Sequence, residues 1–147
     1  MSEVDRFTLL GCEQPSKVVY HRPADRLLVA CRGAQPALQI LDPADGRLVT
    51  ALPIATGVDG LMIDDNRARI VASGDQAFTV IEHAGDDSYR RLGDVATRPG
   101  AKIMTMDKVT GNIFLVAAGR TERASDTGEV TTVYHPDSFT VLRYAAR

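Results

Sequence analysis

The chain has 147 residues and a mass of 15.9 kDa, which suits one ordinary domain. Hydrophobic residues make up 44% and charged residues 24%, a balance typical of folded soluble domains and unlike that of disordered or membrane-spanning chains. The net charge of -2 creates no global field that would attract nucleic acid or anionic lipid, so neither partner is expected.

The first residues predict a cytoplasmic location for the chain as written. MSEVDRFTLLGCEQ carries acids where a signal peptide carries basic residues, and it lacks the apolar run that a signal peptide needs. Within it, residues 4–10 (VDRFTLL) are predicted to form a strand. Cys12 and Cys31 are too few for a zinc site built from Cys-x-x-Cys pairs or for a disulfide-built scaffold.

A repeat of 43 residues organises the rest of the chain. Residues 16–31 (SKVVYHRPADRLLVAC), 59–74 (DGLMIDDNRARIVASG) and 102–118 (KIMTMDKVTGNIFLVAA) align without a gap. Each copy opens with a short apolar run, passes through a polar turn and continues with a second run rich in β-branched and large apolar residues. This pattern indicates a β-hairpin.

The predicted strands follow one another in chain order. They are 18–20, 27–30, 38–42 and 47–54 in the first unit, 61–63, 70–72, 78–82 and 89–96 in the second, and 103–106, 113–116 and 139–143 in the third. Four antiparallel strands in roughly 40 to 45 residues are typical of a β-propeller blade. Helical solenoids use similar periods, but they need longer runs with apolar positions three and four apart, which this sequence lacks.

The sequence resembles the YVTN-type β-propeller repeat proteins. DRLLVACR, LQILDPADGRLVTALPI and RARIVASGDQAFTVIE carry the resemblance, which covers nearly the whole chain. It implies a ring of blades and diverse binding roles, often in exported proteins. The chain holds about three blades, as the C-terminal half of a longer family member would. If it is a fragment of such an exported member, the implied location is periplasmic.

We therefore predict an all-β fold with one partial propeller domain over residues 1–147 and blades at about 16–54, 59–96 and 102–144. Residues 4–10 align with the fourth strand of a blade, so either they complete the last blade of a ring or the chain is cut from a longer parent. Three blades cannot close a ring, whereas two copies provide six. We expect a homodimer in which each N-terminal strand completes the partner's last blade along residues 139–143. Each interface should bury a blade face such as the one expected to carry Val18, Tyr20, Leu28 and Ile40.

Three residues align where the first strand of each unit begins, and we expect them to line the mouth of a central channel. They are Ser16, Asp59 and Lys102, with Glu13 and Arg98 just outside. One interpretation is a site for a small molecule or a protein. The other is an Asp59–Lys102 ion pair that only closes the channel.

Other chemistry-bearing residues leave alternatives open. Cys12 and Cys31 lie where they could form a disulfide, but free thiols are favoured for a cytosolic chain. His21 and His83 fall in hairpin turns at points of their units other than those of the cysteines, so no Cys/His pair is indicated. The long connection 118–138, which contains His135, is expected to be disordered or to form a lid.

The expected function is non-catalytic binding or scaffolding, with the site at the channel mouth and without catalytic residues, cofactor or metal ligands. The alternative is a lactonase- or lyase-type propeller enzyme with a divalent metal ion in the channel. Glu13 and Asp59 are the carboxylates that such an ion would use, and a dimer would double them.

Overall fold

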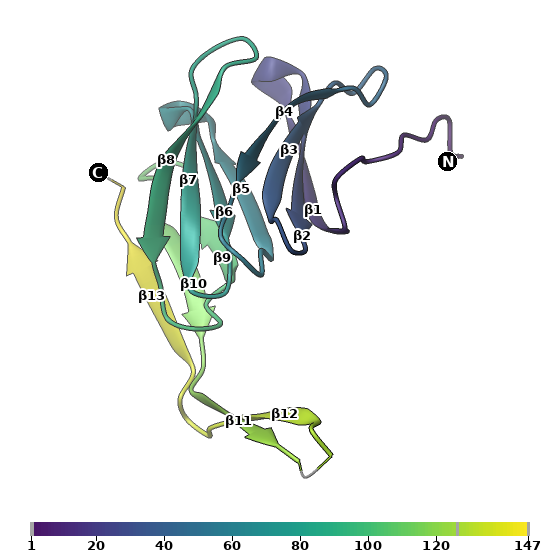
Figure 1. The fold of residues 1–147 in the computed structure, drawn as a ribbon. Helices are drawn as coiled ribbons and strands as arrows, with labels where there is room; N and C mark the ends of the chain where they lie inside the picture. Colours follow the sequence, from purple (N-terminus) through teal and green to yellow (C-terminus); the bar gives the residue numbers. More distant parts are fainter. Residues whose placement is uncertain (1, 126, 147) are drawn as a thin grey trace.

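The computed structural model describes residues 2–125 and 127–146 (Figure 1). The fold is all-β, as predicted, and the helices among the described residues are two short 3-10 turns, Arg22–Ala24 and Asp65–Arg67. No helix in this part of the chain has the length and apolar character needed to cross a membrane.

The strands form three larger antiparallel sheets and one separate hairpin (Figure 1). The predicted strands are confirmed in all three units, and over the described residues every sheet is open. Sheet I contains β1 (Gln14–His21), β2 (Arg26–Arg32), β3 (Ala37–Leu41) and β4 (Leu48–Pro53) in that order. Sheet II contains β5 (Gly60–Asp64), β6 (Arg69–Ser73), β7 (Ala77–His83) and β8 (Tyr89–Ala96). Sheet III contains β13 (Thr140–Tyr144), β10 (Ile113–Ala117) and β9 (Ile103–Met106), also in spatial order.

In each of the three sheets, the turn between the first two strands contains one residue with a left-handed backbone conformation. Asp25, Ala68 and Gly111 stand 43 residues apart and have φ values of 52°, 49° and 75°. This left-handed conformation lets the chain reverse tightly, and it is strained for residues with a side chain. The repeat is therefore present in the backbone as well as in the apolar pattern.

Two hydrophobic clusters hold the three sheets together face to face. The cluster between sheets I and II includes Leu28, Leu38, Leu61 and Ile81, and the cluster between sheets II and III includes Phe78 and Leu115. All are nearly or fully buried. Burial of this kind contributes about 25 cal/mol for each Å² of apolar surface removed from water, so it is the main source of stability for the stack.

One expectation about these faces is wrong. We expected Val18 and Tyr20 to share a face with Leu28 and Ile40, but Leu28 is opposite Val19, and Ile40 is opposite Leu28. Val18 and Tyr20 point to the other face of sheet I and are largely exposed. Because side chains alternate along a strand, a shift of one residue moves a side chain to the opposite face.

Residues 4–10 form no strand in the single chain, and their pairing with the last blade of a partner stays a prediction. From the N-terminus, which lies away from the sheets in Figure 1, the segment runs to the outward face of sheet I, where Leu9 packs near Val29 and Leu41. The carbonyl oxygen of Leu10 accepts a hydrogen bond of 2.7 Å from Nε2 of Gln39. A strand needs a neighbouring edge, and the edge that the prediction assigned to it, β13, belongs to a second copy.

Over its described residues, the connection 118–138 is not disordered. It contains a regular antiparallel hairpin of β11 (Arg120–Ala124) and β12 (Val130–Tyr134), which projects from the end of sheet III (Figure 1). His135 follows β12, and its Nε2 lies 2.6 Å from the hydroxyl of Thr121 at the base of the hairpin. The polar strands of the hairpin pair with each other instead of extending sheet III.

Candidate functional site

The three predicted mouth residues lie at the beginnings of the first strands of sheets I, II and III. Asp59 directly precedes β5, Lys102 directly precedes β9, and Ser16 lies near the start of β1. The Ser16 hydroxyl donates to the carbonyl oxygen of Ala30 at 3.2 Å, so it is bonded within its own sheet. The three residues therefore lie at corresponding ends of the three sheets, each with its own partners, and the channel mouth stays a prediction.

Asp59 and Lys102 do not form the ion pair that we considered. A carboxylate oxygen of Asp59 lies 2.9 Å from the Arg32 guanidinium and 4.0 Å from Nζ of Lys17. Lys102 lies 3.3 Å from a carboxylate oxygen of Asp75. Both acids belong to sheet II, so each basic residue reaches sheet II from one of its two neighbours.

These two contacts are the same inter-sheet contact with the charges exchanged. Arg32 and Asp75 are 43 residues apart, as are Asp59 and Lys102. Sheet I contributes the cation to the first pair, whereas sheet II contributes the anion to the second. About a third of each of these side chains is exposed, so each pair is worth about 0–1 kcal/mol. We call Lys17, Arg32, Asp59, Asp75 and Lys102 the charged end.

Glu13 and Arg98 lie outside the charged end and do not join its ion pairs. A carboxylate oxygen of Glu13 accepts a hydrogen bond of 3.1 Å from the backbone N–H of Ala34, and the side chain packs closely against Gly33. Arg98 is exposed, and its carbonyl oxygen accepts a bond of 3.0 Å from the N–H of Ala101 in the turn before β9. Both residues hold turns.

Cys12 and Cys31 form the disulfide that the sequence allowed, in place of the free thiols expected of a cytosolic chain. Their Cα atoms are 5.3 Å apart. The bond ties the N-terminal segment to the end of β2. One repeat later, the equivalent residues Ala55 and Gly74 are in close contact without a covalent bond.

The opposite end of the sheets contains an aromatic and histidine cluster that sequence reasoning missed. The rings of His21 and His83 are 4.8 Å apart, and His83 stacks on Tyr89 at 4.9 Å. His21 is buried, its Nε2 lies 3.5 Å from Asp65, and its Nδ1 has no hydrogen-bond partner. Burial, and then the neighbouring His83, lower the pKa of His21 below its usual value. Burial likewise raises the pKa of Tyr89.

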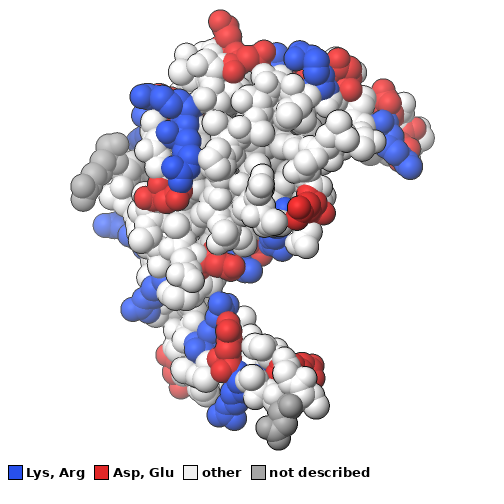
Figure 2. Space-filling view, viewed as in Figure 1, with Lys and Arg blue, Asp and Glu red and all other residues white. Residues whose placement is uncertain are grey.

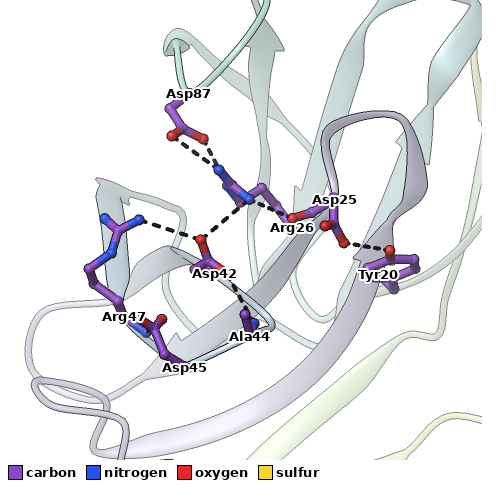
Figure 3. A network of polar contacts seen from close by, with 8 residues as sticks. All are labelled: Tyr20, Asp25, Arg26, Asp42, Ala44, Asp45, Arg47 and Asp87. Carbon is purple, nitrogen blue, oxygen red and sulfur yellow. Dashed lines mark hydrogen bonds and ion pairs between the residues drawn. The ribbon is translucent and has the colours of Figure 1, made fainter.

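Beside this cluster, Arg26 joins sheets I and II (Figure 3). Its guanidinium bonds both carboxylate oxygens of Asp87 at 2.8 and 3.2 Å, and it lies 3.7 Å from Asp42, which also pairs with Arg47. The hydrogen bonds from Arg26 lower the pKa of Asp87. A hollow of about 260 Å³ lies next to the network, and its lining includes Arg26, His83, Asp86 and Asp87.

A larger hollow, of about 460 Å³, lies at the end of sheet III. Its lining includes Lys102, Ile103, Ala118, Arg120 and Phe139. Over the described residues, no group of three His, Cys, Asp or Glu side chains is arranged to hold a metal ion. Charges of both signs are interspersed over the face seen in Figure 2 and over the hairpin.

Comparison of the chain with protein-family models, with curated proteins and with solved structures gave no match.

Proposed function

We propose that the chain is part of a β-propeller of the YVTN type and acts as a non-catalytic binding or scaffolding module. The ligand surface is the charged end, and the partner is a peptide or protein segment that carries charges of both signs. The observation that carries the proposal is the exchange of charges between equivalent pairs, which puts cations and anions side by side on three neighbouring sheets.

The ion pairs of the charged end can be replaced by contacts with a bound peptide. Its side chains are between about a third and a half exposed, so solvent screens their ion pairs. A peptide that offers its own acid to Arg32 and its own base to Asp59 replaces one weak pair with two contacts. The expected gain is mainly in specificity and in the rate of association.

The alternative, a metal-dependent propeller enzyme, would draw its ligands from the same region. Glu13 and Asp59 are engaged there by the Ala34 N–H and by Arg32, and Lys17 adds further positive charge beside Asp59. These contacts oppose binding of a divalent cation between the two carboxylates. A rise in melting temperature with calcium or manganese would support the enzyme instead, because an ion that binds the folded state stabilises it.

A displayed library of random peptides tests the binding function. We expect wild-type protein to select peptides of mixed charge, and we expect Asp59→Asn and Lys102→Gln to weaken their binding about tenfold, the effect of losing about 1.4 kcal/mol. Arg90→Gln is the matched control, since Arg90 forms its ion pair on the outer strand β8. Failure to select any peptide, or equal binding by all variants, would contradict the proposal.

A further inference from the structure

We propose that the outward face of sheet III in one copy of the chain packs on the outward face of sheet I in a second copy, and that residues 4–10 of this second copy pair with β13. This assembly rests on the propeller-type stacking proposed above. It adds a defined partner, a second copy of the same chain, and a defined surface.

The outward face of sheet III is apolar at the position that sheets I and II bury against the next sheet. Leu38, Phe78 and Val141 are opposite the equivalent residues Ala30, Ser73 and Val116. Leu38 is 0% exposed and Phe78 3%, because the next sheet covers them, whereas Val141 is 63% exposed. This face of sheet III therefore has the character of a stacking face without its neighbour.

The outward face of sheet I shows the complementary pattern. Leu61 and Ile63, on the face of sheet II that meets sheet I, are each 7% exposed. Their equivalents one repeat earlier, Val18 and Tyr20, are 65% and 51% exposed. The two open faces thus correspond to the two sides of the interfaces that already join sheets I to II and II to III.

The N-terminal segment already follows the path of a connection between two sheets. Nε2 of Gln39 donates to the carbonyl oxygen of Leu10, and Oγ1 of Thr79, at the same place in sheet II, accepts a hydrogen bond of 2.8 Å from the N–H of Ala55 in the connection from sheet I. Leu9 packs on the outward face of sheet I, and its equivalent Leu52 packs in the cluster between sheets I and II. Leu52, however, also belongs to a strand of the preceding sheet.

The pairing of β4 with β3 and of β8 with β7 shows which strand the segment around Leu9 would pair with. Leu52 in β4 is opposite Leu38 in β3, and Val95 in β8 is opposite Phe78 in β7. The corresponding pair places Leu9 opposite Val141, on the free edge of β13. An unpaired edge strand offers a row of main-chain donors and acceptors, and a second chain can satisfy them.

In the proposed dimer, the start of sheet I of the second copy lies at the hollow at the end of sheet III. In sheet I, Arg32 at the equivalent of Ala118 holds the carbonyl of Val58 at 2.6 Å and the carboxylate of Asp59. In the proposed interface, Ala118 meets Ser16, the equivalent of Asp59. Neither residue is charged, so a second copy leaves no unpaired charge at this position.

Two copies placed in this way use both open faces of each chain. The contact is repeated around a two-fold axis and closes a ring of six sheets, a number within the range of propellers. We expect light scattering to show twice the 15.9 kDa chain mass at micromolar concentration.

Two sets of variants test the interface. Val141→Arg places a charge on the open face of sheet III, and we expect a predominantly monomeric protein. Val109→Arg, in an exposed turn of the same sheet, is the control and should remain dimeric. In addition, Ser16→Asp with Ala118→Arg recreates the Arg32–Asp59 pair at each seam. We expect the double variant to dimerise several-fold more tightly than either single variant.

Wild-type protein that is monomeric at micromolar concentration would overturn the assembly, and so would a dimer that Val141→Arg leaves intact. Absence of coupling between Ser16→Asp and Ala118→Arg would show that the seam lies elsewhere. A monomer that still selects peptides through Asp59 and Lys102 would refute the assembly and leave the binding function standing. An intact dimer that no longer selects peptides would refute the binding function and leave the assembly standing.

Discussion

Ala68 and Gly111 occupy the same turn position in consecutive repeats and share a left-handed backbone, although only glycine adopts it without strain. We expect Ala68→Gly to raise the free energy of unfolding by about 0.5–1 kcal/mol, because relief of strain exceeds the added chain entropy. Urea unfolding measures the change. Gly111→Ala is the reciprocal variant and should destabilise, since its Cβ would also meet the Arg67 guanidinium. Lower stability of Ala68→Gly would contradict this account of the turn.

The Cys12–Cys31 disulfide should stabilise the fold by about 3 kcal/mol, the chain-entropy value for a loop of this size. The two cysteines are 19 residues apart. We expect the double variant Cys12→Ala/Cys31→Ala to unfold at lower urea concentration than the oxidised wild type. Reductant should shift the wild type toward the double variant and leave the double variant unchanged. Identical unfolding of oxidised and reduced wild type would show that the bond does not constrain the fold.

The lowered pKa of His21 predicts loss of stability in mild acid. The unfolded chain takes up its proton near the usual pKa of about 6.5, above the folded value, so protonation favours unfolding as the pH falls from there. At higher pH His21 is neutral in both states and contributes no pH dependence. His83 and Asp65 lie against His21, and Tyr89 stacks on His83.

Melting temperatures between pH of about 7.5 and 5 check this expectation. His21→Phe should flatten the profile, whereas replacement of the exposed His135 by Gln should leave it as in the wild type. Equal acid sensitivity of the wild type and His21→Phe would place the sensitive group elsewhere.

Leu28→Ala should lower the free energy of unfolding by about 2–5 kcal/mol, because it opens a cavity in the core between sheets I and II. Val109→Ala, in an exposed turn, should change stability by less than about 0.5 kcal/mol. Chemical denaturation of both variants at one protein concentration measures the contrast. Similar stability of the two variants would show that the sheets are not held by this cluster.

Much of the fold could be predicted because period and alternation are properties of the sequence itself. Strands 89–96 and 139–143 were recognised as short runs of β-forming residues, and the structure has them as β8 and β13 within one residue. The hairpin of β11 and β12 was missed because β11 is mainly polar and the hairpin has no counterpart in the other repeats. The run VTTVY at Val130–Tyr134, rich in β-branched residues, was the available signal.

The candidate site was harder to predict, because residues facing each other across sheets have no fixed spacing in the sequence. The column of Ser16, Asp59 and Lys102 followed from the repeat, whereas the choice of Arg32 and Asp75 as partners depends on where β2 and β6 end. His21 and His83 were placed at different points of their units, yet stacking of sheets I and II brings their rings into contact.

The exchanged charges of the two inter-sheet pairs also help a chain of similar repeats to stack its sheets in the correct order during folding. If sheet III docked on sheet I in place of sheet II, Lys102 would take the place of Asp59 and lie beside Arg32, so two cations would meet. Such an arrangement is penalised as it forms, while the correct neighbours attract. The sign of the charge at this position therefore favours the correct order of sheets during collapse, when apolar faces of similar shape would otherwise compete for the same partner.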